Sequence, residues 1–577
     1  MPKSRKSSLS SNRPTAPEHA WTESAKLVFK ERYLRKNELG DAVESPADLF
    51  GRVASAVALA ERPGQRSRYR DLFLKAMLTA RFLPNSPTLM NAGKPKGQLS
   101  ACFVLPVEDS LESIFGTLRD AALIHQSGGG TGFSFSSIRP KGSLVRTTKG
   151  AASGPVSFIR IFDTATEIIK QGGVRRGANM AVLRVDHPDI FEFIDSKRDL
   201  RSISNFNISV GLTEAFMEAL SARRSFQLRS PNDRRIVKTV SAEELFSRII
   251  DSAWECGDPG LLFLDRINQF NPTPKSGRME STNPCGEQPL LAYESCNLGS
   301  VNLAKFRDGQ RICWEELGEC VDLGVRFLDN VVTVNSYPLE ECAKVTLGNR
   351  KIGLGVMGFA DLLLGLGVPY DSPEARDIGE RLMSFVDRRA KSASMRLAKE
   401  RGAFPRFRQS LWAQLGYPEM RNATVSTIAP TGTISILAGC SSGIEPIFSA
   451  QFERHVLDGK VLSEVHPAVA LAFQDRGGKG AITEESLRAK LGASWSPARD
   501  LSVEAHLLMQ AVFQRHSDSA VSKTINMPAG ATREDVRRAY VRAYELGCKG
   551  ITVYRDQSRP TQVLRAVRDE SCEVCAD

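Results

Sequence analysis

One short segment of this 577-residue chain combines side chains that can act together on a small ligand. The segment "NPCGEQPLLAYESC", residues 283–296, places Asn283, Cys285 and Glu287 at alternate positions. In an extended chain alternate residues point to the same side, so an amide, a thiol and a carboxylate can face one ligand. A carboxylate can act as a general base, and a thiol as a nucleophile or hydrogen donor. A loop with a partly buried cysteine is the alternative explanation of this spacing.

Two further cysteines stand close to the C-terminus. Cys572 and Cys575 form a C-x-x-C pair. Structural zinc needs four ligands, and neither a second cysteine pair nor a nearby histidine accompanies this one, so a zinc site is the weaker alternative. The spacing is typical of a redox-active dithiol. The sequence therefore predicts thiol–disulfide exchange at the tail.

Hydroxyl side chains and a glycine follow a β-like stretch in "TVSTIAPTGTISI". Thr431, Gly432, Thr433 and Ser435 stand where a helix is expected to begin, and hydroxyls with free backbone N–H groups at such a point suit a phosphate. An ordinary helix cap is the alternative for this segment taken alone. The glycine-rich stretch "SGGGTGF" follows a helical pattern, so it indicates a helix stop and a tight turn, not a dinucleotide fingerprint.

These candidates need a scaffold, and the sequence predicts an α/β one. Helical patterns fill residues 21–80, with Ser45-Pro46 as a helix start, and the two prolines of "RFLPNSPTLMNAG" predict a loop after them. From there to about residue 556, β-rich runs such as "ACFVLPV", "TGFSFSSI", "MAVLRVD" and "ATVSTIA" alternate with helical stretches, which favours parallel strands. We expect four parts: a disordered basic tail (1–20), a helical region (21–85), an α/β catalytic domain (86–556) and a flexible tail (557–577).

The composition narrows the class of protein. Hydrophobic residues make up 41% and charged residues 25%, the balance of a folded globular protein. No run of 18 apolar residues predicts a membrane span, and the first 20 residues suggest a disordered tail more than a transit peptide. Eleven scattered cysteines indicate a reducing, cytoplasmic setting without a disulfide framework. The net charge of +11 fits anionic ligands, but basic residues are not clustered, so nucleic-acid binding is not expected.

Several segments together carry a family resemblance. "STNPCGEQPLLAYESCNLGSVNLAKF" resembles the finger-loop region of ribonucleotide reductases, in the adenosylcobalamin-dependent class II form. "FLPNSPTLMNAGKPKGQLSACFVLPV", "QGGVRRGANMAVLRVDHPDIFEFI", "NRKIGLGVMGFADLL", "APTGTISILAGCSSGIEP" and "ELGCKGITVYRD" are similar to family segments in family order, from about residue 21 to 556. The resemblance implies an α/β fold: a ten-stranded α/β barrel of the ribonucleotide reductase and glycyl-radical type, with an N-terminal helical region and a central finger loop.

The resemblance also implies an activity, the reduction of ribonucleotides to 2′-deoxyribonucleotides for DNA synthesis. Cys285 would carry a thiyl radical that takes the 3′ hydrogen of the substrate ribose, since S–H and activated C–H bonds are close in strength. Glu287 would take the 3′-hydroxyl proton, and Asn283 would orient the sugar or Glu287. Cys102 and Cys296 match the pair that supplies two electrons. Only the fold can bring their Cα atoms to the roughly 4.4–6.8 Å that a disulfide needs.

Further roles follow from the same likeness. Cys572 and Cys575 would reduce the active-site disulfide again and receive electrons from a thioredoxin-type protein. Ser86 matches a substrate-contacting position. The segment near residue 430 becomes the substrate phosphate site, with Thr431, Gly432, Thr433 and Ser435. We expect ribonucleoside diphosphates as substrates, although the sequence does not distinguish them from triphosphates.

An effector site is implied as well. Asp109 would read the ribose or base of a deoxynucleotide or ATP, and Arg139 would hold its phosphate. The loop 172–180, "GGVRRGANM", would complete this site with Gly173, Arg175 and Arg176, and solvated arginine side chains are the weaker alternative. In the family this site lies at a dimer interface, so the resemblance implies a homodimer.

The radical source distinguishes the remaining alternatives. Class I enzymes use adjacent tyrosines, and none of the nine tyrosines here are adjacent. We found no glycyl-radical segment of class III, so adenosylcobalamin is the expected cofactor, and without a D-x-H-x-x-G motif no protein ligand to its cobalt is expected. A class I-like large subunit with a separate radical protein is the second hypothesis. A non-catalytic nucleotide-binding regulator is the third, but it would be expected to have lost Cys285, Glu287 or a reducing cysteine.

Overall fold

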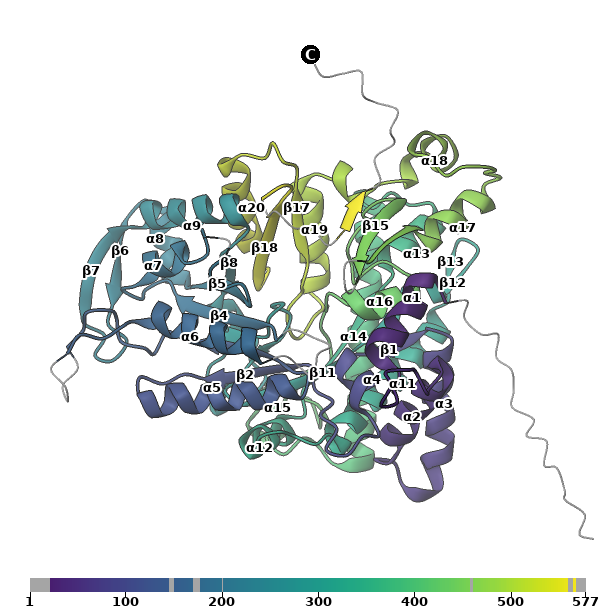
Figure 1. Ribbon diagram of the computed structural model, residues 1–577, viewed down its shortest axis with the longest axis horizontal. Coiled ribbons are helices and arrows are strands. Elements are labelled where there is room, and N and C mark those ends of the chain that lie inside the picture. Colours follow the sequence, from purple (N-terminus) through teal and green to yellow (C-terminus); the bar gives the residue numbers. More distant parts are fainter. Residues whose placement is uncertain are drawn as a thin grey trace, which may run out of the picture.

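The central element of the fold is a ten-stranded sheet. A computed structural model describes residues 21–144, 150–169, 177–199, 201–456, 460–558 and 564–566. Within these residues the strand order is β1-β11-β2-β3-β4-β5-β8-β18-β17, and β14 also pairs with β11 (Figure 1). The sheet and the N-terminal helices confirm the expected α/β architecture with a helical N-terminal region.

One half of the sheet is parallel, as the alternating pattern predicts. Neighbouring strands β2, β3, β4, β5 and β8 all run in the same direction. Their bounds are β2 Cys102–Pro106, β3 Gly130–Ser134, β4 Asn179–Arg184, β5 Phe206–Leu212 and β8 Gly260–Phe263. The helices that lie between these strands in the sequence are α5 Leu111–Gln126, α6 Pro155–Ile168, α7 Ile190–Asp195, α8 Glu214–Ser221 and α9 Ala242–Cys256. They pack their apolar faces against the strands, and Phe133, Phe162 and Phe206 lie in the shared core.

Four of the other five strands, β11, β14, β17 and β18, run opposite to the parallel half, whereas β1 pairs antiparallel with β11 and so runs in the same direction as β2. Strand β11 pairs antiparallel with β2, and β18 pairs antiparallel with β8. The bounds are β1 Phe82–Pro84, β11 Glu294–Asn302, β14 Ile352–Met357, β17 Thr524–Met527 and β18 Gly550–Arg555. The predicted strand "ATVSTIA" is extended but forms only isolated bridges, Leu354 to Ser426 and Ile428 to Val521. Because these bridges reach β14 on one side and the approach to β17 on the other, this segment joins the two ends of the sheet into a barrel.

The N-terminal region is helical, as predicted. It contains α1 Glu23–Val28, a π-helix Phe29–Tyr33, α2 Pro46–Ala58 and α3 Arg66–Leu78. Ser45 caps α2 and exchanges hydrogen bonds with Asp48, which confirms the predicted helix start. The predicted loop after residue 80 is wrong, because it contains strand β1 and helix α4 Ser86–Asn91. Its prolines lie at a strand end and in a first helical turn, positions that tolerate the missing N–H group.

The remaining elements cover the barrel and form a smaller sheet. Strands β16, β15 and β19 form a three-stranded sheet, and in Figure 1 its strand β15 lies with helices α17 and α18 at the upper right. The helices are α10 Leu264–Gln269, α11 Trp314–Val334, α12 Glu340–Asn349, α13 Phe359–Leu366, α14 Pro373–Arg401, α15 Leu411–Gln414, α16 Gly432–Ala438, α17 Pro467–Asp475, α18 Glu484–Leu491, α19 Val503–Gln514 and α20 Arg533–Glu545. The strands are β6 Ser225–Arg229, β7 Ile236–Ser241, β9 Ser281–Thr282, β10 Pro289–Leu290, β12 Arg307–Asp308, β13 Arg311–Ile312, β15 Gln451–Val456, β16 Lys460–Val465 and β19 Leu564–Ala566.

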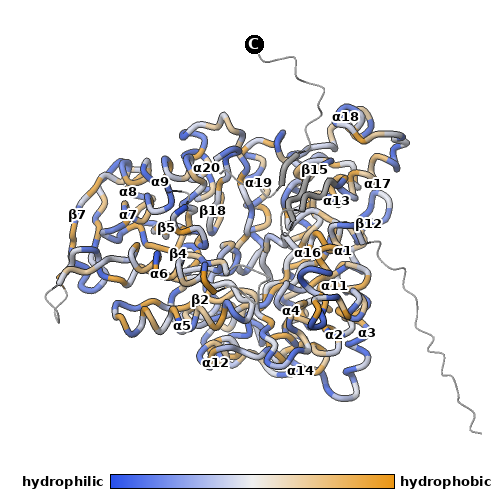
Figure 2. Tube along the Cα trace, in the orientation of Figure 1, coloured by the Kyte–Doolittle hydropathy of each residue, from blue (hydrophilic) through white to orange (hydrophobic). Residues whose placement is uncertain are grey.

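Hydropathy follows this architecture. Along the helices in Figure 2, hydrophobic and hydrophilic residues alternate, which is the pattern of helices half-buried against other elements. In the part of the chain that the structure describes, no helix has both the length and the apolar character needed to cross a membrane.

Candidate active site

The thiol–carboxylate segment forms the tip of a hairpin. Strands β9 and β10 pair antiparallel, and residues 283–288 connect them. The expected extended chain is interrupted by a turn, since Gly286 has φ +84°, a conformation that glycine adopts readily. As a result Cys285 is exposed, whereas Asn283 and Glu287 are buried. The turn therefore leaves the thiol exposed at the tip and its two polar neighbours buried in the same cluster.

The parallel half of the barrel holds one side of the hairpin. A Cβ atom at Gly132 in β3 would lie 1.8 Å from the Thr282 carbonyl oxygen, so only glycine allows this close approach. The Asn207 side chain in β5 donates a hydrogen bond of 2.8 Å to the Pro284 carbonyl. These contacts fix the hairpin against β3 and β5.

The closing segment of the barrel holds the other side. The Glu287 carbonyl accepts hydrogen bonds from the Thr427 hydroxyl, at 3.0 Å, and from the Ala520 N–H, at 2.9 Å. Within the hairpin, the Gln288 N–H donates to Asn283 Oδ1 at 3.0 Å. Since one side is bonded to strands of the parallel half and the other to the closing segment, the backbone around Cys285 and Glu287 is held in place from both sides.

The predicted reducing cysteines face each other across two strands. Cys102 in β2 is the direct antiparallel partner of Cys296 in β11. Such partners have Cα atoms about 4.5–5.5 Å apart, within the range of a disulfide. Both side chains are buried thiols, and burial raises their pKa values well above the usual range. The fold thus places a reduced, protonated pair where a disulfide can form.

The hairpin tip and the cysteine pair form one cluster. The Asn283 Nδ2 group donates a hydrogen bond of 3.1 Å to Cys102 Sγ. After burial, the largest influences that raise the pKa of Cys102 are the charges of Glu287, Cys296 and Cys285. The structure therefore brings together all five predicted catalytic residues, from three separate segments of the chain.

Glu287 is the acid–base candidate of this cluster. Burial raises the pKa of its carboxyl group to about 7, although a backbone hydrogen bond and the Asn283 side chain lower it. Its Oε2 atom has no hydrogen-bond partner among the residues that the structure describes. A buried carboxyl group with a near-neutral pKa can exchange a proton at physiological pH, so Glu287 is suited to act as a general base.

The sequence did not predict a buried ion pair that lies next to Cys296. Lys351 Nζ lies 2.7 Å from Glu294 Oε2, and both side chains are fully buried. The Asn349 side chain donates to the other Glu294 oxygen at 2.6 Å, and the Cys296 thiol donates to the Lys351 carbonyl at 3.8 Å. The only signal in the sequence was the position of each charge directly before a β-like run, Glu294 before "SCNLGSV" and Lys351 before "IGLGV".

The predicted phosphate segment lies at the start of α16. Thr431 precedes the helix at φ 52°, and its hydroxyl accepts a hydrogen bond of 2.8 Å from the Gly443 N–H. Gly432 is exposed, while Ser435 is buried and hydrogen-bonds to Ser442 at 3.0 Å. The exposed backbone at Gly432 leaves this segment accessible to a ligand.

The two other predicted substrate residues contact the N-terminal region. The Thr433 hydroxyl accepts a hydrogen bond of 3.3 Å from Arg32 Nη1, and the Ser86 hydroxyl lies 2.8 Å from the Tyr33 hydroxyl. Sequence reasoning missed Arg32 and Tyr33, because nothing in their local pattern distinguishes them from ordinary helical residues.

Part of the predicted effector site is assembled. Arg139 Nε lies 2.8 Å from Asp109 Oδ2, and the Arg139 N–H donates to the other carboxylate oxygen at 3.0 Å. Asn232 adds a hydrogen bond of 2.9 Å to Asp109. The remaining predicted residues lie outside the described residues: Gly173, Arg175 and Arg176 of the effector loop, and Cys572 and Cys575 of the tail.

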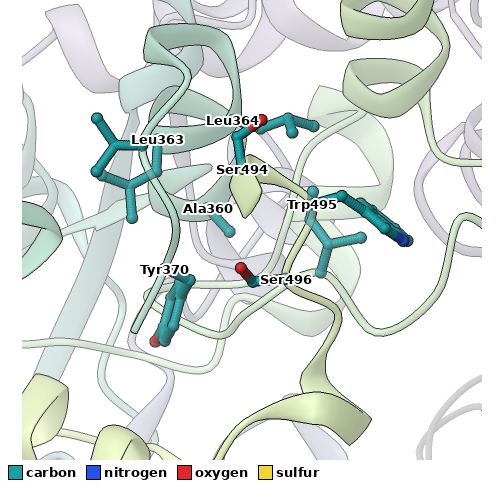
Figure 3. Close-up of a pocket in the computed structure, with 9 residues that line it drawn as sticks. Ala360, Leu363, Leu364, Tyr370, Ser494, Trp495 and Ser496 are labelled. Carbon is teal, nitrogen blue, oxygen red and sulfur yellow. The ribbon is translucent and has the colours of Figure 1, made fainter. Parts of the chain in front are cut away.

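Two hollows in the described residues lie away from this cluster. One of about 10 Å³ is enclosed by α13 and the segment that follows α18, with Leu363, Tyr370 and Trp495 around it (Figure 3). A space of this size holds about one water molecule. The other, of about 410 Å³, lies on the helical region beside Arg35, Glu44 and Arg52. Neither hollow is lined by a residue of the thiol cluster.

Comparison with known proteins identifies the family. The model for the ribonucleotide reductase barrel domain matches residues 100–419 and 415–554, and that for the all-alpha domain matches residues 21–97. A vitamin B12-dependent ribonucleoside-diphosphate reductase of Thermoplasma acidophilum is 48% identical, over 94% of this chain and 80% of its own length. A protein of that name from Mycobacterium tuberculosis H37Rv is also 48% identical, over 94% and 78%. The chain belongs to the ribonucleotide reductase family.

Proposed function

We propose that this chain reduces ribonucleotides to 2′-deoxyribonucleotides with adenosylcobalamin as the radical source. The observation that carries the proposal is the arrangement of three thiols and one carboxyl group: Cys285 exposed at the hairpin tip, Cys102 facing Cys296 behind it, and Glu287 between protonation states. Relatives that are 47–48% identical over nearly the whole chain are named vitamin B12-dependent ribonucleoside-diphosphate reductases. Their names favour diphosphate substrates.

Cys285 would transfer the hydrogen atom. When bound, adenosylcobalamin supplies the one-electron chemistry that removes the thiol hydrogen. The residues fit such a group, because the Cys285 side chain is exposed at the tip of the hairpin while the other two thiols are buried. The Cys285 sulfur would then take the 3′ hydrogen of the ribose and return it at the end of the cycle.

Glu287 would be the general base for the 3′-hydroxyl proton, which becomes easier to remove once the 3′ hydrogen is gone. As a carboxylate it would accept the 3′-hydroxyl proton of the sugar radical, which lets the 2′-hydroxyl leave as water. Asn283, whose amide donates a hydrogen bond to Cys102 Sγ, would orient the sugar or Glu287. Asn283 and Glu287 stand on the same hairpin, whose backbone is held in place, and this supports their acting together on one sugar.

Cys102 and Cys296 would supply the two electrons. Their two S–H bonds are replaced by one S–S bond, and the hydrogens and electrons convert one ribonucleotide into one deoxyribonucleotide and one water. The facing positions on β2 and β11 support this step because little backbone movement is needed to join the sulfurs.

Cys572 and Cys575 would reduce the pair again by thiol–disulfide exchange, using electrons from a thioredoxin-type protein. Replacing both tail cysteines with serine should abolish turnover with that reductant and preserve turnover with a small dithiol. Equal loss with both reductants would contradict the relay.

An effector nucleotide and a second copy of this chain would complete the enzyme. Asp109 and Arg139 would bind a deoxynucleotide or ATP. Helices α5 and α6, which follow β2 and β3, expose apolar side chains: Leu111, Phe115, Leu123, Ile161 and Ile168. Such a surface beside the effector residues supports a homodimer contact. The Phe115→Lys protein should then sediment as a monomer where the wild type sediments as a dimer.

One assay tests the proposed reaction. Purified protein, a ribonucleoside diphosphate, a dithiol and adenosylcobalamin should yield the deoxyribonucleotide, and omission of the cofactor should abolish it. Turnover that needs a second, radical-carrying protein and ignores adenosylcobalamin would favour the class I-like alternative. Nucleotide binding without any turnover would favour the regulator.

A further inference from the structure

Both predicted substrate segments lack charged side chains. Residues 427–442, "TIAPTGTISILAGCSS", and residues 82–92, "FLPNSPTLMNA", contain no lysine, arginine, aspartate or glutamate. A ribonucleoside diphosphate nevertheless brings several negative charges to this site. Hydroxyls and backbone N–H groups alone leave these charges without an ionic partner, so a cation from another part of the chain is of interest.

Arg32 supplies a cation at this place. Its Nη1 atom donates to the Thr433 hydroxyl at 3.3 Å, and its Nε atom is buried without a hydrogen-bond partner among the described residues. The half-buried side chain is thus held against the segment with donor capacity left over. Because the Thr433 oxygen accepts from Arg32, its own hydrogen stays available for another acceptor, such as a phosphate oxygen.

The next residue contacts the other segment. The Tyr33 hydroxyl lies 2.8 Å from the Ser86 hydroxyl at the start of α4. Two consecutive residues therefore reach two predicted substrate segments that are more than 300 residues apart in sequence. This is possible because α1 lies against α16 and the π-helix that follows it lies against α4 (Figure 1).

The local backbone explains the placement. Residues Phe29–Tyr33 form a π-helix, closed by the Leu34 N–H bond of 3.0 Å to the Phe29 carbonyl, and such turns are frequent at functional sites. Phe29 anchors the turn, because its ring packs edge-on against Trp21 at 5.0 Å and Phe50 at 5.8 Å. The anchored turn directs Arg32 and Tyr33 toward the barrel.

We propose that Arg32 binds the substrate phosphates together with the Thr431–Ser435 segment, and that Tyr33 positions Ser86 at the same site. The inference rests on the proposed function and extends it, because it makes the all-α region a part of the substrate site. Guanidinium suits this role, since its planar set of N–H donors can contact Thr433 and a phosphate oxygen at the same time.

The test compares three variants. Arg32→Gln removes the charge, Arg32→Lys keeps the charge but not the planar donors, and Lys30→Gln removes one charge from an exposed side chain of the same π-helix. For each protein, the inhibition constant of pyrophosphate, the KM for CDP and kcat are measured with adenosylcobalamin and saturating deoxynucleotide effector. Thermal unfolding curves check the fold.

We expect Arg32→Gln to weaken pyrophosphate inhibition and raise the KM for CDP by roughly 10- to 100-fold, the worth of one charge-assisted hydrogen bond. The value of kcat should change only a few-fold. Arg32→Lys should lie between this variant and wild type, and Lys30→Gln should match wild type. Inhibition by cytidine, which has no phosphate, should be equal in all four proteins.

Two results would overturn the inference while leaving the proposed function intact. One is an active Arg32→Gln protein with wild-type KM and pyrophosphate inhibition. The other is an equal loss of cytidine and pyrophosphate inhibition, which would mean that Arg32 only supports the fold. A wild-type protein that does not reduce CDP would instead refute the proposed function. If Arg32→Gln fails to fold, the Arg32→Lys protein serves as the test. A weaker inhibition by pyrophosphate with unchanged inhibition by cytidine would then support the inference, and an equal change in both would contradict it.

Discussion

Two buried carboxyl groups of this molecule have opposite surroundings. Glu61 lies between the helical region and α11, where its two oxygens accept from Arg326 at 2.8 and 2.9 Å, and Arg401 lies 2.7 Å away. Burial would raise its pKa, but these hydrogen bonds and Asn330 lower it to about 2. Glu287 has no cation among the causes of its shift, and burial raises its pKa to about 7.

The presence or absence of a paired cation distinguishes a structural carboxylate from a reactive one. The Glu61 cluster includes Asp329, whose carboxylate is paired with Arg350, Arg401 and Arg421, so each buried negative charge has a partner. A paired carboxylate stays ionised and contributes to folding, whereas an unpaired one near neutrality can gain or lose a proton. Glu61 thus connects the helical region to the barrel, whereas Glu287 is suited to proton transfer.

The largest effect is expected at the reactive carboxyl group. Glu287→Gln keeps the shape but removes the base, so kcat should fall by about 10²- to 10⁴-fold. Stability in urea should stay the same or increase at neutral pH, because a buried carboxyl group that resists ionisation is replaced by a neutral amide. A stable Glu287→Gln protein with wild-type kcat would show that Glu287 is not the general base.

The same replacement at the paired carboxylate should have the opposite outcome. Glu61→Gln leaves Arg326 and Arg401 with fewer negative partners in a buried place, so the free energy of unfolding should fall by about 3–5 kcal/mol. The value of kcat should remain within a few-fold well below the melting temperature. Urea unfolding and steady-state assays at 25 °C check both statements, and unchanged stability would show that the cluster is dispensable.

The pH dependence should have opposite signs for the two groups. Folding raises the pKa of Glu287 from 4.5 to about 7, so its contribution to stability is lost as pH rises from 4.5 to 7. Folding lowers the pKa of Glu61 from 4.5 to about 2, so its contribution is present above 4.5 and lost as pH falls toward 2. Urea unfolding of each Glu→Gln variant between pH 3 and 8 should show these slopes as differences from wild type.

The activity should follow the same proton. Because Glu287 must be ionised to accept a proton, kcat/KM should rise with pH through about 7 and then level off. A profile that is flat between pH 5.5 and 8 would indicate that another group is the base.

A partly exposed ion pair gives the smallest expected effect on stability. The Arg139 and Asp109 side chains retain 29% and 18% of their exposure, so Asp109→Asn should cost less than about 1 kcal/mol. In the Asp109→Asn protein, added deoxynucleotides should no longer change which ribonucleotide is preferred as substrate. A retained response would separate this pair from effector binding.

The spacing of residues 283–287 marked this segment as a candidate, because the pattern involves only neighbours in sequence. The spacing left an ordinary loop with a partly buried cysteine as an equal alternative until the family resemblance was considered. It did not show that the turn at Gly286 exposes Cys285 and buries Glu287. The facing cysteines 102 and 296 were found only through family resemblance, since pairing of β2 with β11 is a long-range event. The Lys351–Glu294 pair and Arg32 were missed for the same reason. Pro84 and Pro87 predicted a loop, but Pro84 ends β1 and Pro87 lies in the first turn of α4.

The central claim is that the exposed sulfur exchanges hydrogen with the sugar while the two buried sulfurs supply electrons. It is tested most directly by following Cys285→Ser and Cys102→Ser with a ribonucleotide tritiated at the 3′ position, adenosylcobalamin and a dithiol. The account predicts that Cys285→Ser forms no deoxynucleotide and leaves the label in place, while Cys102→Ser releases label without sustained deoxynucleotide formation. Deoxynucleotide formation by the Cys285→Ser protein would contradict it.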